Sequence, residues 1–498
     1  MASLSRQSSI YIVLSAVFIV INIATLSHLA PWIDEVMFLD TAYNAAVHGS
    51  WETTAWYRVA GQYPFPTYPP LYQMLATAWI WLFGSGMETV RSLNLFITFV
   101  LGGACLRLLR HHGLQLNPST TALFTVLLWG TAEMAWMYRN GRPDLLCALM
   151  TVFTVLIAEK HLAAGTILTR TAVIVASALV LCSGIQAAVL LCVLWLFVFI
   201  TMKNRRKELI RLLGLLLTGF LMGLLLVTLF MLAHGRLLGF ASSIVQYSAT
   251  LSHIALTVLP WAGETFGFSA TPFTEKLLEL NTESDLGERL ASVVDYHSFV
   301  ILSVTALAAL VMTFRHKLRQ MLSNKTFQTL LFALCVPVVM NIAGRFTSYY
   351  RWMAFVPLLL CVTAIADRRR LWCGVFGVMA LVLTITGVRS MMPDARWDRA
   401  NVRSFIQRQQ FKPTDAVVCP FSVFYELKPV CDTCYFAGIF PTQFIAHADY
   451  IIEATDGNEF DRPITAYIHQ LQADTTIVLT AVDYCEQPLL TLYQVRTK

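Results

Sequence analysis

Residues 9–35 read SIYIVLSAVFIVINIATLSHLAPWIDE, an apolar run that ends at two adjacent acids. A helix needs roughly 20 apolar residues to cross a hydrocarbon core about 30 Å thick. The run is too long and begins too late for a cleaved signal peptide, and it shows no clear small-residue cleavage site. We therefore expect a retained first span near residues 10–30, with Asp34 and Glu35 just beyond its end.

The whole chain has the composition of a membrane protein. Of its 498 residues, 56% are hydrophobic and 13% are charged, and the mean hydropathy is +0.61. Soluble domains carry roughly 25% charged residues, so this composition excludes a soluble globular enzyme and a disordered regulator. Eleven apolar segments predict membrane-spanning helices, near residues 10–30, 88–108, 119–138, 144–159, 170–183, 186–202, 209–233, 296–314, 327–343, 350–366 and 372–390.

Basic residues follow every second predicted span, with the largest cluster at residues 203–211. The positive-inside rule places these loops and the N-terminus in the cytoplasm, and the C-terminus outside. The net charge of +6 then reflects cytoplasmic loops, and no nucleic-acid partner is expected. We expect a multi-pass protein of a bacterial inner membrane. Its membrane domain would cover residues 1–390, with outer loops 31–87 and 234–295, and residues 391–498 would form a periplasmic or extracellular domain.

The C-terminal tail has a different character from the rest of the chain. Strand-like stretches occur at 416–419, 448–452, 476–480 and 490–495, and helix-like stretches near 397–410 and 463–472. This pattern predicts a small α/β domain. The predicted fold class is thus an α-helical polytopic membrane protein of about eleven transmembrane helices with a small C-terminal α/β extracytoplasmic domain.

Four of the eleven cysteines lie in this outer domain, and the other seven lie in or beside spans as small apolar side chains. An even set in an oxidising compartment predicts two disulfides, with three connectivities open. A zinc site or a Cys-x-x-Cys redox pair is the alternative for the second and third of them. The four candidates are Cys419, Cys431, Cys434 and Cys485.

The two acids after the first span have a structural and a functional interpretation. An apolar pattern with helical spacing follows them and Gly49 would end that helix, so Asp34 could be a plain N-cap and Glu35 could favour the positive helix end. A carboxylate fixed at a helix start on the membrane surface could instead act as a base or metal ligand. A second motif, Tyr68-Pro69-Pro70, opens an apolar segment too short to span, which predicts an interfacial or re-entrant helix.

Two short outer turns carry further charged groups. The turn between the third and fourth spans contains Arg139, Arg142 and Asp144, and the turn between the ninth and tenth contains Arg345, Tyr349 and Arg351. Snorkelling and aromatic-belt anchoring are the structural interpretations. Arginine also pairs well with phosphate oxygens, and ionisable groups are costly at this depth. Together these loops predict an outer site for a ligand with a lipid tail, a phosphate and a polar head.

These elements together resemble the GT-C glycosyltransferases, polytopic enzymes that use polyprenyl-phosphate sugars, in the branch of protein O-mannosyltransferases and aminoarabinose transferases. The elements that match, in order and spacing over roughly residues 10–390, are Trp32-x-Asp34-Glu35, Tyr68-Pro69-Pro70-Leu71-Tyr72, Leu82-Phe83-Gly84 with Arg91, Arg142-Pro143-Asp144, and Arg345-x3-Tyr349-Tyr350 with Pro357. The sequence departs from the aminoarabinose transferases at Tyr68, where they tend to have lysine, and at Met37, where they tend to have arginine.

The resemblance implies an inverting transfer of a sugar from a polyprenyl-phosphate donor to a hydroxyl on a lipid, glycan or protein. It implies that Asp34 acts as base or helps to bind a metal, that Glu35 positions a substrate, and that Arg142 and Asp144 lie near the donor phosphate. A divalent metal is a second candidate cofactor, with Asp34 and His253 as candidate ligands, although a lone loop histidine is more often a plain polar residue. No glycine-rich phosphate loop points to a nucleotide donor.

Two other classes fit parts of the sequence. A transporter or flippase predicts inverted repeats and charges at mid-membrane, whereas the acids here gather at the outer ends of spans. A non-catalytic scaffold with an outer sensor domain predicts no dependence on Asp34. The glycosyltransferase accounts for most of the pattern.

Overall fold

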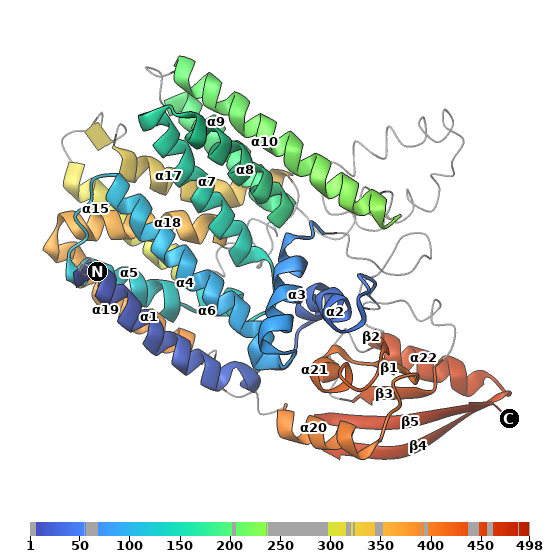
Figure 1. Cartoon of the computed structure of the whole chain (residues 1–498). Coiled ribbons are helices and arrows are strands. Elements are labelled where there is room, and N and C mark those ends of the chain that lie inside the picture. Colours follow the sequence, from blue (N-terminus) through green and yellow to red (C-terminus); the bar gives the residue numbers. More distant parts are fainter. Residues whose placement is uncertain are drawn as a thin grey trace.

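The computed structural model is mostly helical, with a small sheet at the C-terminal end (Figure 1). It describes residues 6–53, 55, 68–201, 206–235, 237, 297–314, 320–321, 324–343, 352–389, 391–392, 397–436, 448–455, 462–486 and 488–497. Most of the predicted outer loop 234–295, with His253, and the turn with Arg345, Tyr349 and Arg351 lie outside these residues.

Each of the eleven apolar segments contains helix in the part of the chain that the structure describes. The third segment is split at Thr131, whose backbone is extended. The helices are α1 (Arg6–Thr25), α4 (Met87–His111), α5 (Pro118–Gly130), α6 (Ala132–Tyr138), α7 (Asp144–Ala164), α8 (Ile167–Ser183), α9 (Ile185–Thr201), α10 (Arg206–Ala233), α15 (His297–Phe314), α17 (Lys325–Ala343), α18 (Trp352–Arg368) and α19 (Arg370–Arg389).

Six of these helices are long and apolar enough to cross a membrane, namely α1, α4, α7, α10, α15 and α19. The protein is thus an integral membrane protein, and the count of eleven spans stays a prediction. Helices approach closely where small residues meet. A Cβ on Gly387 of α19 would lie 2.0 Å from the carbonyl oxygen of Gly130 in α5, so a larger residue there would force these helices apart.

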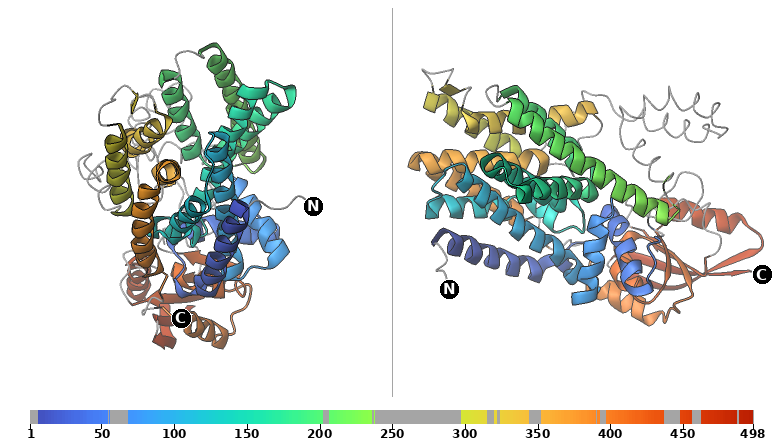
Figure 2. Two further views of the ribbon diagram at one scale, coloured as in Figure 1. Left: turned by 90° about the vertical axis from the view of Figure 1, so that its left-hand side faces the viewer. Right: turned by 45° about the horizontal axis from the view of Figure 1, so that its top comes forward.

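Two shorter helices lie between the bundle and the C-terminal sheet (Figures 1 and 2). Helix α2 (Ile33–His48) follows the 3-10 turn η1 (Leu26–His28) and ends at Gly49, which has a left-handed φ of 67°. Helix α3 (Leu71–Phe83) begins directly after Pro70. The helix expected after the two acids and the short helix opened by proline are both present.

The C-terminal part is a five-stranded mixed sheet in the order β2-β1-β3-β5-β4. Strand β1 pairs in parallel with β2 and β3, and β5 pairs antiparallel with β3 and β4. The strands are β1 (Ala416–Cys419), β2 (Thr433–Phe436), β3 (Tyr450–Ala454), β4 (Ile477–Glu486) and β5 (Leu489–Thr497). Four of them overlap the predicted stretches, whereas β2 was not expected because its four residues show no clear strand pattern.

Helices cover both faces of this sheet. Ile464 and Ile468 of α22 (Arg462–Ala473) pack with Val418 and Ile451 on one face. On the other side, α20 (Arg399–Arg408), the turn η4 (Phe421–Val423) and the short α21 (Phe424–Leu427) share a continuous core with the membrane helices. The sheet therefore presents α21 toward α2 (Figure 1).

The sheet corrects the prediction of two disulfides. All four cysteines of the C-terminal domain are free thiols and buried. Cys419 lies on β1 and Cys434 on the adjacent β2, while Cys485 lies on β4 at the far edge of the sheet. Three strand spacings of about 4.8 Å separate β1 from β4, far more than the roughly 4.4–6.8 Å between Cα atoms that a disulfide allows. Cys485 is therefore out of reach of the other three.

Candidate active site

The two acids that follow the first span occupy the first turn of α2. Trp32 is the N-cap residue of this helix, so the interpretation of Asp34 as a plain N-cap is wrong. The backbone N–H of Trp32 donates to Glu35 Oε2 at 3.4 Å. The two carboxylates, although adjacent in sequence, engage different arginines, and they form the two halves of the site.

Asp34 forms the first half with the turn between α6 and α7. Arg142 Nη1 donates to Asp34 Oδ2, and Arg142 Nε donates to Asp144 Oδ2 at 2.7 Å. The side chains of Arg142 and Asp144 are 7% and 4% exposed, whereas that of Asp34 keeps 21% of its surface exposed. Asp34 is therefore the member of this trio that an incoming substrate can reach most easily.

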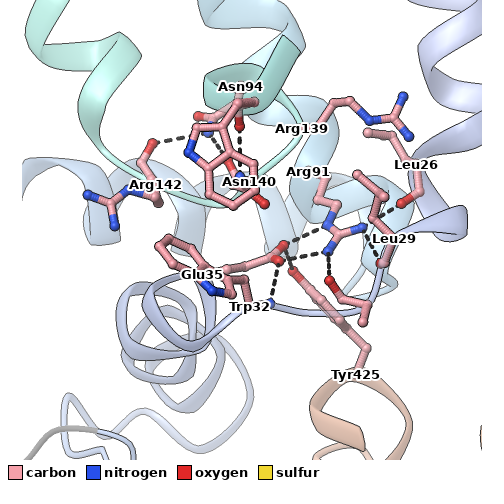
Figure 3. Close-up of polar contacts among 12 residues, drawn as sticks. Leu26, Leu29, Trp32, Glu35, Arg91, Asn94, Arg139, Asn140, Arg142 and Tyr425 are labelled. Carbon is pink, nitrogen blue, oxygen red and sulfur yellow. Dashed lines mark hydrogen bonds and ion pairs between the residues drawn. The ribbon is translucent and has the colours of Figure 1, made fainter. Parts of the chain in front are cut away.

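Aromatic rings and a backbone turn hold Arg142 in place. Its guanidinium carbon lies 5.8 Å from the ring centre of Trp32 and 5.7 Å from that of Phe38, both within cation–π range. The side-chain amide of Asn94 donates to the carbonyl oxygens of Asn140 and Arg142 (Figure 3). These contacts leave the guanidinium little freedom, which favours a preformed cationic group.

The same turn approaches α2 so closely that any side chain larger than that of glycine at position 141 would force its neighbours to shift. A Cβ on Gly141 would lie 2.3 Å from Leu39 Cδ1 and 3.1 Å from Glu35 Cγ. The start of α7 therefore packs against the first turns of α2. Asp34 and Asp144, which are far apart in the sequence, lie close together as a result.

Glu35 forms the second half of the site with α4 and the C-terminal domain. Arg91 donates from Nε and Nη2 to the two oxygens of Glu35, both at 2.7 Å, and both side chains are 0% exposed. Arg91 also donates to the carbonyl oxygens of Leu29 and Ala30 at 3.0 and 3.2 Å. The hydroxyl of Tyr425 in α21 donates to Glu35 Oε1 at 2.7 Å (Figure 3). Glu35 is therefore fully partnered and turned away from solvent.

Burial raises the pKa of the Asp34 carboxyl above its ordinary value. Arg142 opposes this shift by stabilising the charged form, and the nearby Asp144 carboxylate adds to it. A carboxylate whose pKa lies closer to neutrality is a better general base. This shift makes Asp34 a candidate proton acceptor, whereas Glu35 is held in its buried ion pair with Arg91.

Two other predicted site residues, Arg139 and Tyr68, make contacts outside the trio of Asp34, Arg142 and Asp144. The guanidinium of Arg139 is turned to α1, where it donates to Asn22 Oδ1 at 3.0 Å and to Thr25 Oγ1 at 2.8 Å, so the structure does not bring Arg139 to Arg142 (Figure 3). Tyr68 lies at the site's edge, with its ring 5.0 Å from that of Phe38 and its hydroxyl donating to Gln186 Oε1 at 2.5 Å.

The remaining predictions concern the proline pair and four residues outside the described part of the chain. Pro69 and Pro70 directly precede α3, and Pro70 is its N-cap residue. Arg345, Tyr349, Arg351 and His253 lie outside the described residues, and their proposed roles stay predictions.

The pairing of Asp34 and Asp144 with one guanidinium also bears on whether the site could bind a divalent metal. Carboxylate oxygens are the ligands that magnesium and manganese prefer, and Asp34 and Asp144 could supply one each. Within the described ranges, however, no group of three or more histidine, cysteine, aspartate or glutamate side chains is placed to hold a metal. Arg142 already supplies a positive charge between the two acids. This part of the site fits neutralisation by arginine better than a metal centre.

An apolar cavity lies along α7 below the site. Its volume is about 280 Å³, and its lining runs from Ala148 to Leu162 along α7, with α18 and α9 as further walls. Ala148 is one helical turn from Asp144. The polar side chains His112, Glu159, Lys325 and Arg368 border the cavity toward the opposite helix ends.

No family model and no curated protein sequence matches this chain. Among solved structures, ArnT from Cupriavidus metallidurans bound to undecaprenyl phosphate has 11% sequence identity and a TM-score of 0.48, and the match covers 97% of each chain. The oligosaccharyltransferase AglB from Archaeoglobus fulgidus, in complex with an inhibitory peptide and a dolichol-phosphate, has 10% identity and a TM-score of 0.50. That match covers 90% of this chain and 69% of AglB.

The chain has the GT-C fold. The resemblance drawn from the loop motifs is therefore confirmed at the level of the fold. In this chain the start of α2 and the turn before α7 lie together, and these positions carry Asp34, Arg142 and Asp144.

Three side chains around this candidate site were not among the predicted site residues. Arg91 was noted as a matching element but given no role, although a buried arginine at the mouth of a span is itself a signal. Asn94 is one turn further along α4. Tyr425 lies 390 positions from Glu35 in the sequence, and no local pattern connects the two.

Proposed function

We propose that the protein is an integral membrane glycosyltransferase. It transfers a sugar from a polyprenyl-phosphate donor to a hydroxyl acceptor on the outer face of the membrane, with inversion at the anomeric carbon. The observation that carries the proposal is the trio of Asp34, Arg142 and Asp144 at the start of two helices, where a partly exposed carboxylate lies against a fixed guanidinium.

The trio supports a single displacement step. The Asp34 carboxylate takes the proton of the acceptor hydroxyl, and the acceptor oxygen forms a bond to the anomeric carbon. The bond from that carbon to the phosphate oxygen breaks, and the electron pair leaves with the phosphate. Phosphate is a good leaving group that needs no general acid, so one base and a cationic group suffice.

The ion pair between Asp34 and Arg142 gives this step a physical coupling. While Asp34 is charged, Arg142 is shared between two carboxylates. Once Asp34 has accepted the proton, its hold on the guanidinium weakens, because a neutral acid attracts a cation far less than a carboxylate does. Arg142, still paired with Asp144, can then donate hydrogen bonds from Nη1 to the phosphate as its negative charge increases.

The cavity along α7 supports a donor with a long apolar tail. Its walls are mainly leucine, valine and aromatic side chains, and it begins one turn below Asp144. An isoprenoid chain bound there would leave its phosphate near Arg142. AglB, whose fold this chain shares, is described in complex with a dolichol-phosphate, a lipid of the same class.

Purified protein in lipid nanodiscs tests the proposal with synthetic polyprenyl-phosphate pentoses and hexoses. Release of free polyprenyl phosphate, followed by mass spectrometry, identifies a consumed donor, and NMR of the product gives its anomeric configuration. We expect release with at least one donor, inversion in the product and no consumption of nucleotide sugars. Consumption of a nucleotide sugar, or no release with any lipid-linked donor in the presence of a cell-envelope acceptor extract, would contradict the proposal.

A further inference from the structure

One short segment of the C-terminal domain contacts α2 at two points. Tyr425 donates to Glu35 at 2.7 Å, and Lys428, at the end of α21, forms an ion pair with Asp40 at 3.1 Å. The side chains of Lys428 and Asp40 are 1% and 0% exposed. Both contacts are therefore buried between α21 and the helix that carries Asp34.

The two contact points constrain the orientation of α2. Glu35 and Asp40 are five residues apart, which is about 7.5 Å along a helix axis. A single contact would leave the helix free to pivot, whereas two contacts at different heights fix both its position and its tilt. The Asp40 carboxylate also accepts a hydrogen bond from Thr53 Oγ1, so its second oxygen is held by the chain that follows α2.

The contacting segment is itself anchored to the membrane helices. Glu426, between the two contact residues, accepts from Arg399 Nε at 2.6 Å and from Arg403 Nε at 3.0 Å. Arg399 of α20 in turn pairs with Glu88 in the first turn of α4. The C-terminal domain therefore contacts both α2 and α4, the two helices that the buried ion pair between Glu35 and Arg91 joins.

The charges at this interface are balanced only when the two parts are docked. Burial by itself would lower the pKa of Lys428, but the Asp40 carboxylate raises it above its ordinary value, so the lysine stays charged in the docked state. Loss of either partner would leave a buried charge uncompensated, which is strongly unfavourable. The contact is therefore specific for one docking geometry and not a general adhesion.

We propose that Tyr425 and Lys428 are positioning residues for the transfer reaction, because they hold α2 so that Asp34 faces the acceptor. This inference rests on the proposed function. A displacement of a reacting group by about 1 Å can cost on the order of a hundredfold in rate, so small changes in the tilt of α2 should affect the turnover number.

The variants Tyr425→Phe and Lys428→Met test the proposal in nanodiscs. Tyr425→Phe removes one hydroxyl and keeps the ring in place. We expect kcat to fall by about ten- to a hundredfold while KM for the lipid-linked donor changes by less than about twofold. Matched controls in the same domain are Tyr484→Phe, at a residue that is 63% exposed, and Lys412→Met, at another exposed residue. Both controls should retain wild-type kcat.

Two further measurements separate positioning from folding. Hydrogen exchange should speed up at the amides of residues 36–40 in Lys428→Met and stay unchanged in Lys412→Met, with no change in the strands. In the Asp34→Asn background, Tyr425→Phe should cause little further loss, because both substitutions impair the same proton-transfer step. A reduced thermal midpoint with wild-type kcat, or losses that multiply in the double variant, would overturn the positioning role.

The outcome also separates this inference from the proposed function. An active wild type, an inactive Asp34→Asn and a fully active Tyr425→Phe would refute the positioning role and leave the transferase proposal intact. A wild type that transfers no sugar from any polyprenyl-phosphate donor would overturn both.

Discussion

The buried pair of Arg91 and Glu35 gives a large and measurable stability effect. Arg91→Met removes two hydrogen bonds of 2.7 Å to the carboxylate and the donors to the carbonyl oxygens of Leu29 and Ala30, at a point where both charged side chains are 0% exposed. Among the described residues, Glu35 would keep the hydroxyl of Tyr425 as its one side-chain donor. Breaking one side of a buried ion pair costs about 3–5 kcal/mol, so we expect a loss of that size in the free energy of unfolding.

Denaturation in mixed detergent–SDS micelles, followed by tryptophan fluorescence, measures this loss. Arg107→Met is the matched control, because Arg107 lies on the same helix with an exposed side chain. The double variant Glu35→Leu with Arg91→Met should be more stable than Arg91→Met alone, since no buried carboxylate is left without its partner. If the free energy of unfolding of Arg91→Met is within about 1 kcal/mol of that of the Arg107→Met control, the buried ion pair does not stabilise the protein as proposed.

Three further predictions concern packing, topology and pH. Gly141→Ala should lower the free energy of unfolding by about 1–3 kcal/mol, because its Cβ would overlap Leu39, and a thermal-shift assay showing wild-type stability would count against this packing. Val482→Cys, at a position 53% exposed on β4, should react with a membrane-impermeant maleimide in intact spheroplasts, while the unsubstituted chain with its buried outer thiols labels slowly; labelling of Val482→Cys only after permeabilisation would reverse the orientation. Transfer should decline as the pH falls through the raised pKa of Asp34, because the base must be deprotonated, and Asp144→Asn should move this acid limb to lower pH by removing a like charge; a limb that stays in place would mean that another group titrates.

Local patterns predict a large part of this fold. Apolar run length located the helical segments, and Pro70 marked the start of α3, because both signals depend only on neighbouring residues. The strand β2 was missed because it is an edge strand of four residues whose partner is β1. The two-disulfide prediction failed for a related reason, because the order of strands in a sheet is a tertiary property that cysteine spacing does not encode.

The candidate site was predictable in part. Asp34, Arg142 and Asp144 were identified because acids and arginines at the ends of spans are unusual, and the structure places them in one ion-pair network. The direction of Arg139 could not be foreseen, since Asn22 and Thr25 on α1 compete for its guanidinium. The roles of Tyr425 and Lys428 depend on how a separate domain docks on α2, which no sequence motif indicates.

The rate of sugar transfer by Asp34→Asn tests the central claim most directly. Asparagine keeps the size of aspartate and supports a helix start about as well, so protein yield and thermal stability should stay near wild type. Asp398→Asn is the matched control, because Asp398 is an exposed N-cap residue, at the start of α20 in the C-terminal domain. The account predicts that Asp34→Asn loses about 10²–10⁴ in kcat while Asp398→Asn keeps wild-type activity. Near-normal transfer by Asp34→Asn from a defined polyprenyl-phosphate donor would contradict the mechanism.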